Sequence, residues 1–207
     1  MYLSRLTLDS QHPQARRDLG NAYEMHRTLT RAFVTDANAP PSRFLWRRES
    51  DLNGEGATNL LIQSDVPADW SVIESLGGYA LQVQGNKKVD LSQWVQTGRR
   101  YRYRLLVNPT VTRGGKRFGL NREDEQLAWF NRQGDQHGFT LLACLRTGHD
   151  LLRTHRSKSG DKITLQTALL EGVLQVTDST ALQLAIQHGL GHGKAMGLGL
   201  LSLAPVI

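Results

Sequence analysis

The order of strand-like and helix-like segments constrains the fold of this chain more than any other feature. Strand-like runs, recognised by alternating or apolar residues, occur at residues 2–8, 43–49, 57–64 and 79–84, and helix-like runs occur at 13–33 and 69–75. This order is β-α-β-β-α-β, which is that of a ferredoxin-like domain. The first helical run is predicted to break near Gly20-Asn21, and Asp69 is a predicted N-cap of the second.

The rest of the chain repeats the same order with insertions. Strand-like runs occur at residues 99–107, 139–145, 150–154, 164–176 and near the C-terminus, and helix-like runs occur at 123–132 and 178–188. A basic hairpin is predicted at residues 110–118, because Gly114-Gly115 lies in its middle. Asn121 and Asp178 are predicted to cap the two helices.

We therefore expect an α+β protein with two tandem ferredoxin-like (RRM-like) βαββαβ domains. The chain has 207 residues, which is enough for two domains of about 100 residues each. The domains are predicted at residues 1–87 and 95–207, with the polar segment Gly85–Asp90 as a linker. Hydrophobic residues make up 39% of the chain and charged residues 21%, a composition that is typical of folded proteins rather than disordered ones.

The composition also predicts where the protein resides. No apolar run approaches the ~20 residues that span a bilayer, and the N-terminal residues lack the apolar core of a signal peptide. Cys144, the only cysteine, cannot form an internal disulfide and is predicted to be a buried small hydrophobe. These features predict a cytoplasmic protein that is not bound to a membrane.

A glycine-rich run ends the chain, at residues 188–205. Its glycines surround Lys194, and they are Gly189, Gly191, Gly193, Gly197 and Gly199. Glycine permits positive φ, and successive free N–H groups can form a nest for an anion, so the lysine indicates phosphate. The spacing matches neither a P-loop nor a dinucleotide-binding fingerprint. The alternative is a flexible linker, which the following leucines disfavour.

Tyr23 and His26 form the candidate catalytic pair. They are three residues apart, so they share a face of the predicted helix, and Arg27 and Arg31 lie beside them. Histidine exchanges a proton near neutral pH and tyrosine can donate a hydrogen bond. This set suits RNA cleavage in which the 2′-hydroxyl attacks the adjacent phosphate. The alternative is a surface histidine on an amphipathic helix, with Tyr23 in the core.

The sequence predicts neither a metal site nor a cofactor. His188 and His192 have an i,i+4 spacing, but glycines between them argue against a helix that presents both to zinc. No carboxylate pair and no Cys/His cluster offers a second catalytic centre.

Basic residues gather in groups that favour an anionic partner. The net charge is +6, and arginine, which suits bidentate contact with phosphate, outnumbers lysine. Arg100, Arg102 and Arg104 are expected on one strand face, which either binds phosphate or faces solvent. The candidate RNA-binding residues are Arg27, Arg31, Arg113, Lys116, Arg117, Arg156, Lys158, Lys162 and Lys194. Solvated loops are the alternative for the loop clusters.

Six sequence motifs together resemble one known family. They are Met1 to Ser4, Tyr23 to Leu29, Asn108-Pro109, Asp124 to Trp129, Glu171 to Leu174 and Gly189 to Pro205. On these motifs the chain closely resembles the CasE endoribonucleases of type I-E CRISPR systems, over nearly its whole length.

The resemblance implies metal-independent cleavage at the base of a CRISPR repeat hairpin. It implies products with a 2′,3′-cyclic phosphate and a 5′-hydroxyl, continued binding of the guide RNA, and association with the other Cascade subunits by a protein that is monomeric alone. The family's catalytic histidine and tyrosine match His26 and Tyr23. One departure is Leu106, where relatives often carry a basic residue.

Two other classes of function remain open at this point. One is an RNA-binding subunit of the same fold without catalysis, which the pairing of Tyr23 with His26 disfavours. The other is a nucleotide-binding enzyme that uses the glycine-rich run, which the mismatched phosphate-loop spacings disfavour.

Overall fold

The computed structural model divides the chain into two compact units. It describes all residues except 37, 50–55, 156–159 and 207. The first unit comprises residues 1–89, 153–163 and 195–197, and the second comprises residues 90–152, 164–194 and 198–207. Two short later segments of the chain therefore belong to the first unit.

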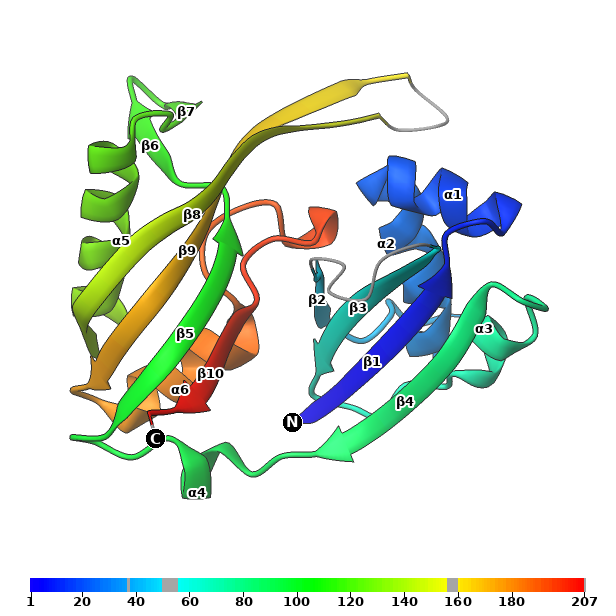
Figure 1. Ribbon diagram of the computed structural model, residues 1–207, viewed down its shortest axis with the longest axis horizontal. Helices are drawn as coiled ribbons and strands as arrows, with labels where there is room; N and C mark the ends of the chain where they lie inside the picture. The colour runs from blue at the N-terminus through cyan, green and yellow to red at the C-terminus, as the bar shows by residue number, and fades with distance from the viewer. Residues whose placement is uncertain (37, 50–55, 156–159, 207) are drawn as a thin grey trace. The chain divides into compact units, whose positions relative to one another are not determined.

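The first unit contains a four-stranded antiparallel sheet, and helices connect some of its strands along the chain (Figure 1). Its elements are β1 (Tyr2–Asp9), α1 (Pro13–Gly20), α2 (Ala22–Thr30), the 3-10 helix η1 (Arg31–Phe33), β2 (Phe44–Arg48), β3 (Ala57–Ser64), α3 (Ser71–Glu74) and β4 (Ala80–Lys88). The strand order is β2-β3-β1-β4. Residues of the strands and helices form one buried core, which includes Leu6, Met25, Leu29, Leu60 and Ile73.

The second unit repeats this arrangement. Its elements are α4 (Leu91–Trp94), β5 (Arg100–Val107), β6 (Thr110–Arg113), β7 (Lys116–Gly119), α5 (Glu123–His137), β8 (Phe139–His155), β9 (Lys162–Val176), α6 (Ser179–His188), the 3-10 helix η2 (Lys194–Met196) and β10 (Leu201–Pro205). The end of β8, the start of β9 and residues 195–196 of η2 are counted with the first unit. The strand order β10-β5-β9-β8 matches that of the first sheet, and β6 and β7 form a separate hairpin. The predicted tandem ferredoxin-like fold is confirmed.

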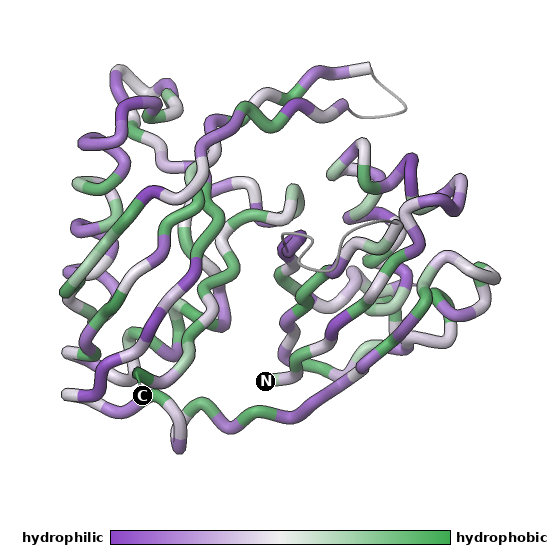
Figure 2. Tube along the Cα trace, viewed as in Figure 1, coloured by the Kyte–Doolittle hydropathy of each residue, from purple (hydrophilic) through white to green (hydrophobic). Residues whose placement is uncertain are grey.

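Local sequence patterns explain several of these elements. In β5 the alternation buries Tyr101, Tyr103 and Leu105, whereas the arginines between them lie on the other face. Hydrophobic residues recur along the strands of both sheets (Figure 2). Helix α6 starts at the predicted cap, where the Asp178 carboxylate accepts hydrogen bonds from two backbone N–H groups.

The predicted linker is wrong over Gly85–Lys88, because these residues continue strand β4. Gly85 lies against Trp70, where an added Cβ would come within 2.5 Å of the ring. Asn86, at a φ of 57°, exchanges hydrogen bonds of 2.8 Å with the backbone of Ala68. Long-range packing therefore keeps a polar segment in the sheet.

Three smaller predictions are also corrected. Arg122, rather than Asn121, is the N-cap of α5, and no side chain caps the helix; acidic residues fill its first turn instead and favour the positive end of the helix dipole. The two strands predicted at 139–145 and 150–154 are one strand, β8. Cys144 is half-buried rather than buried, because β8 is the edge strand of its sheet.

Among the described residues, none of the helices combines the length and the apolar character that crossing a membrane requires.

Candidate functional site

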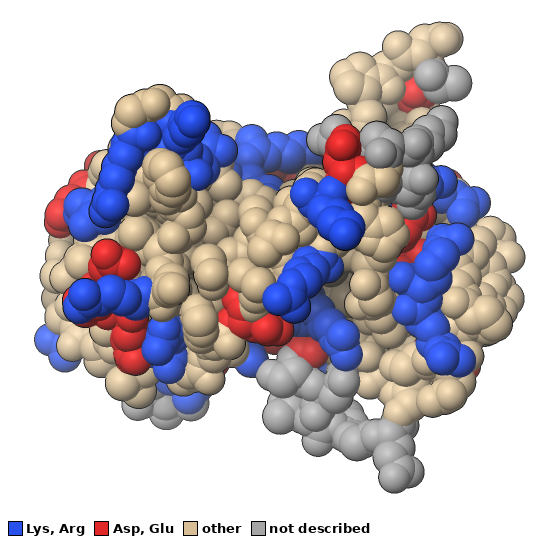
Figure 3. Space-filling model, turned by 90° about the horizontal axis from the view of Figure 1, so that it is seen from above, with Lys and Arg blue, Asp and Glu red and all other residues tan. Residues whose placement is uncertain are grey.

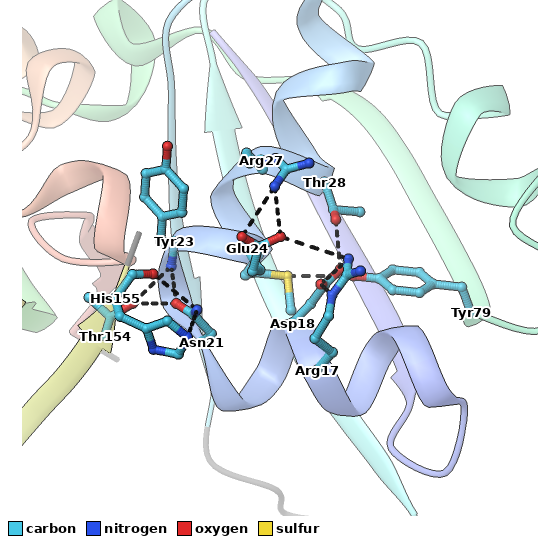
Figure 4. Close-up of polar contacts among 11 residues, drawn as sticks. Arg17, Asp18, Asn21, Tyr23, Glu24, Arg27, Thr28, Tyr79, Thr154 and His155 are labelled. Carbon is cyan, nitrogen blue, oxygen red and sulfur yellow. Dashed lines mark hydrogen bonds and ion pairs between the residues drawn. The ribbon is translucent and has the colours of Figure 1, made fainter. Parts of the chain in front are cut away.

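Helix α2 carries both candidate catalytic residues, and a single residue determines where it begins. The Asn21 side chain accepts a hydrogen bond from the backbone N–H of Tyr23 at 3.1 Å, which makes it the N-cap. His26 follows three residues after Tyr23, so the two lie about one helical turn apart. The Tyr23 ring points away from the polar contacts of Asn21 (Figure 4), so its hydroxyl is directed away from the cap.

The His26 imidazole lies on an aromatic stack. Its ring centroid is 4.9 Å from that of Phe44 in β2, and Phe44 in turn stacks on Phe33 at 4.4 Å. The Nδ1 atom of His26 is buried, with no hydrogen-bond partner among the residues that the structure describes. Burial lowers the pKa of His26 below 6.5, so it favours the neutral imidazole at pH 7.

A buried carboxylate joins α2 to its neighbours. Asp18 of α1 is fully buried, and it accepts hydrogen bonds from Thr28 of α2 at 2.6 Å and from the Tyr79 hydroxyl at 3.0 Å (Figure 4). Arg17 forms an ion pair with the same carboxylate at 2.8 Å. Burial, together with the charge of Asp18, raises the pKa of Tyr79. These contacts fix α2, and hence His26, against α1 and the start of β4.

The candidate RNA-binding side chains differ in whether they are exposed and in whether an acidic partner already balances their charge. Arg27 donates to both oxygens of the buried Glu24 carboxylate, at 3.1 and 3.2 Å, so part of its charge is already balanced. Arg31 and Lys162 are exposed and belong to the first unit. Arg156 and Lys158 lie outside the described residues.

The β6–β7 hairpin of the second unit is strongly basic. Arg113 pairs with Lys116 across its turn, Thr112 pairs with Arg117, and all residues of β7 are exposed. Figure 3 shows groups of Lys and Arg side chains on the face in view, with fewer acidic side chains among them. The hairpin thus presents a compact cationic surface to solvent.

The glycine-rich run is a packed loop rather than a flexible linker. All five of its glycines have positive φ, and the backbone from Gly197 to Leu200 is buried. A Cβ at Gly199 would lie 2.4 Å from the carbonyl oxygen of Leu190. The Lys194 ammonium donates a hydrogen bond to the carbonyl oxygen of Gly191, so the lysine also closes its own loop.

Within the described parts of the chain, no group of three His, Cys, Asp or Glu side chains is placed to hold a metal ion.

The sequence patterns did not identify several residues that shape the site. They are Asp18, Phe44, Thr154 and His155. Phe44 could be recognised only as part of a strand, and the contacts of Thr154 and His155 with Asn21 join residues more than 130 positions apart. A local pattern carries no signal for such contacts.

The fold and the site define a tandem ferredoxin-like protein whose first unit carries a stacked, partly buried histidine on a capped helix. Comparisons with known proteins give its family. A family model described as "CRISPR associated protein" matches residues 1–205. The chain is 37% identical to the CRISPR-associated endoribonuclease Cse3 of Thermus thermophilus, over 99% of this chain and 100% of that protein.

Two further comparisons agree. The chain is 30% identical to the CRISPR system Cascade subunit CasE of Escherichia coli, over the full length of both. A solved structure of Cse3 bound to a 19-nucleotide RNA superposes with a TM-score of 0.88 at 36% identity, covering 99% of this chain and 100% of that one. The chain therefore belongs to the CRISPR-associated protein family, as a CasE-type endoribonuclease.

Proposed function

We propose that this protein binds the hairpin of the CRISPR repeat in precursor CRISPR RNA and cleaves it without a metal ion. The 2′-hydroxyl attacks the adjacent phosphate, and the products carry a 2′,3′-cyclic phosphate and a 5′-hydroxyl. The protein then stays bound to the mature guide RNA and joins the other Cascade subunits in the cytoplasm, while it is a monomer on its own. Three relatives support this proposal: one is named an endoribonuclease, one is named a Cascade subunit, and one was solved in complex with RNA.

The observation that carries the proposal is that His26 is largely buried and stacked on Phe44. Its burial favours the neutral imidazole at pH 7, and the stack on Phe44 holds the ring in one plane. A neutral imidazole can accept the proton of the 2′-hydroxyl, and the resulting imidazolium can return a proton to the leaving 5′-oxygen. Proton transfer of this kind needs no metal ion.

Tyr23 has a complementary role in this proposal. Its position one turn before His26, with the hydroxyl directed away from the helix cap, suits a hydrogen bond to the phosphate or to the attacking oxygen. The phenol would then stabilise negative charge while His26 moves the proton.

Phosphate binding is assigned to the basic side chains. We propose that the exposed hairpin residues Arg113, Lys116 and Arg117 bind the backbone of the RNA stem, with contributions from Arg27, Arg31, Arg156, Lys158, Lys162 and Lys194. Leu106 cannot supply the phosphate contact that a basic residue there would make.

The experiment that tests the function uses a 5′-labelled repeat hairpin in excess EDTA, with a second hairpin that carries a 2′-deoxy nucleotide at the cleavage site. We expect cleavage of the first RNA to a cyclic phosphate end, and no cleavage of the second although it binds equally well. Binding without cleavage of either RNA would favour the non-catalytic subunit, and cleavage of the deoxy hairpin would rule out 2′-hydroxyl attack.

A further inference from the structure

Asn21 is the single residue between helices α1 and α2. Its backbone N–H bonds to the Asp18 carbonyl at 3.2 Å, which ends α1, and its own carbonyl accepts from Met25 at 3.0 Å, which starts α2. Its side chain is buried, with 6% of the residue exposed. The direction of the helix that carries Tyr23 and His26 therefore depends on this one position.

The Asn21 amide also contacts the far end of β8, a segment that belongs to the same unit. Its Oδ1 accepts from the hydroxyl of Thr154, and its Nδ2 donates to the backbone carbonyl of His155 at 3.1 Å (Figure 4). The Tyr23 N–H, which is capped by Oδ1, also lies 3.2 Å from the Thr154 hydroxyl oxygen. One amide thus binds the first turn of α2 and two residues of β8.

The orientation of this amide is determined by its partners. The Tyr23 N–H can only donate, so the atom that faces it is Oδ1, and the His155 carbonyl can only accept, so the atom that faces it is Nδ2. The imidazole Nε2 of His155 lies 3.4 Å from the same Nδ2 and is therefore on the accepting side. Both ends of the amide are satisfied, which only asparagine among the usual N-cap residues allows.

A second N-cap in the chain shows what an ordinary cap looks like. The Asp178 carboxylate accepts from the N–H groups of Thr180 and Ala181, at 2.9 and 3.0 Å, and makes no other hydrogen bond or ion pair among the described residues. Asn21 likewise caps α2, by accepting from the N–H of Tyr23, and in addition it hydrogen-bonds to Thr154 and His155 of β8. Capping alone does not account for the amide at this position.

We propose that Asn21 is a positioning residue for RNA cleavage, which, with Thr154 and His155, fixes the first turn of α2 against β8. This inference rests on the proposed function. The cap and the contact to β8 together fix the backbone at Tyr23, and the rigid helix passes that constraint to His26 one turn later. A group that is displaced by about 1 Å from its reacting position can lose a large part of its rate effect. The clamp of these three residues therefore acts on the cleavage rate more than on RNA binding.

Isosteric variants separate the clamp from the cap. Asn21→Asp keeps the accepting oxygen for Tyr23 but places a carboxylate oxygen against the His155 carbonyl. Thr154→Val removes the hydroxyl at nearly constant volume, and Thr154→Ser restores it. Asp178→Asn, the reverse exchange at the ordinary cap, is the matched control. Cleavage is measured in single turnover at saturating protein, with hairpin affinity measured separately on uncleavable 2′-deoxy RNA.

We expect Asn21→Asp and Thr154→Val to lower the cleavage rate about 10-fold or more while the affinity changes less than about 2-fold. Thr154→Ser and Asp178→Asn should cleave within about 2-fold of the unaltered protein. Hydrogen exchange, measured without RNA, should rise over residues 22–26 in Thr154→Val and not in Thr154→Ser. This readout reports the clamp even for a variant of reduced stability.

The outcomes distinguish this proposal from the function on which it rests. If the unaltered protein does not cleave the hairpin, the proposed function fails and the positioning role fails with it. If it cleaves, but Asn21→Asp and Thr154→Val cleave equally fast, only the clamp is refuted. A Thr154→Ser variant as slow as Thr154→Val would also refute it, because the hydroxyl would then not be the cause.

Discussion

The imidazole of His26 stacks on the phenyl ring of Phe44, with ring centroids 4.9 Å apart and ring planes 24° from parallel. The two residues come from α2 and β2, so the stack joins the helix that carries the candidate catalytic residues to a strand of the sheet. Because Phe44 itself stacks on Phe33, the plane of the imidazole is set by two further elements rather than by the helix alone. Offset aromatic pairs of this kind favour one ring orientation.

The stack predicts that Phe44→Leu slows cleavage by about 5- to 10-fold, because the substitution keeps an apolar side chain but removes the flat surface under His26. The loss of stability should be only about 1 kcal/mol, as for other swaps of similar volume. Phe139→Leu, at a buried phenylalanine of the second unit, is the control for weakened packing. Equal cleavage by both variants would show that the stack does not orient the imidazole.

Burial lowers the pKa of His26, which gives a pH dependence of stability with a definite sign. As the pH falls below about 6.5, the unfolded chain binds a proton at this histidine while the folded protein stays neutral until a lower pH. The unfolded state therefore binds more protons in this window, and the folded state loses stability as the pH falls.

The comparison that isolates this effect is urea unfolding of the unaltered protein and of His26→Gln, at about pH 7.5 and about pH 5.5. Glutamine keeps a polar side chain but does not titrate. We expect the unaltered protein to lose more stability than the variant on acidification. Parallel losses in the two proteins would mean that His26 titrates as it does in the unfolded chain.

The packed glycine-rich loop predicts that Gly199→Ala is strongly destabilising. The position has a φ of 89°, and the added Cβ would lie 2.4 Å from the Leu190 carbonyl oxygen. Gly98→Ala is the matched control, since its φ is 85° but no atom lies within 4 Å of the added Cβ. Backbone strain alone should cost about 1–2 kcal/mol in both, and the thermal melt of Gly199→Ala should fall further. Equal melting temperatures would contradict the close packing.

The basic hairpin predicts a change in the salt dependence of RNA binding. Replacing Arg113, Lys116 and Arg117 together by alanine should flatten the plot of log affinity against log salt by about 0.7 to 0.9 for each phosphate that the variant no longer neutralises. Replacing the exposed Lys87 and Lys88 of β4 should leave the slope unchanged. A triple variant with the original slope would show that the hairpin does not bind phosphate.

Much of the fold could be predicted from local patterns. The break between α1 and α2 at Asn21, the hairpin around Gly114-Gly115 and the cap at Asp178 all follow from residue types with strong backbone preferences. The strand order then follows from the order of the elements, since each β-α-β-β-α-β unit forms its own four-stranded sheet and the two sheets have the same strand order.

The errors lie where distant contacts override local preference. Gly85 and Asn86 have the composition of a linker, but Trp70 and Ala68 hold them in β4. The surroundings of the site could not be predicted for the same reason. The spacing of Tyr23 and His26 identifies them in the sequence, whereas the stack on Phe44 and the hydrogen bonds from the Asn21 amide to β8 form only on folding.

The proposed function depends above all on proton transfer by His26 in metal-independent RNA cleavage. The measurement that tests this role most directly is single-turnover cleavage of the repeat hairpin in EDTA by the unaltered protein and by His26→Ala, with hairpin affinity measured for both. We expect the variant to cleave at least ~100-fold more slowly, the usual scale for the loss of a general acid or base, while it binds the hairpin almost equally well. Cleavage by His26→Ala at nearly the original rate would contradict proton transfer by His26.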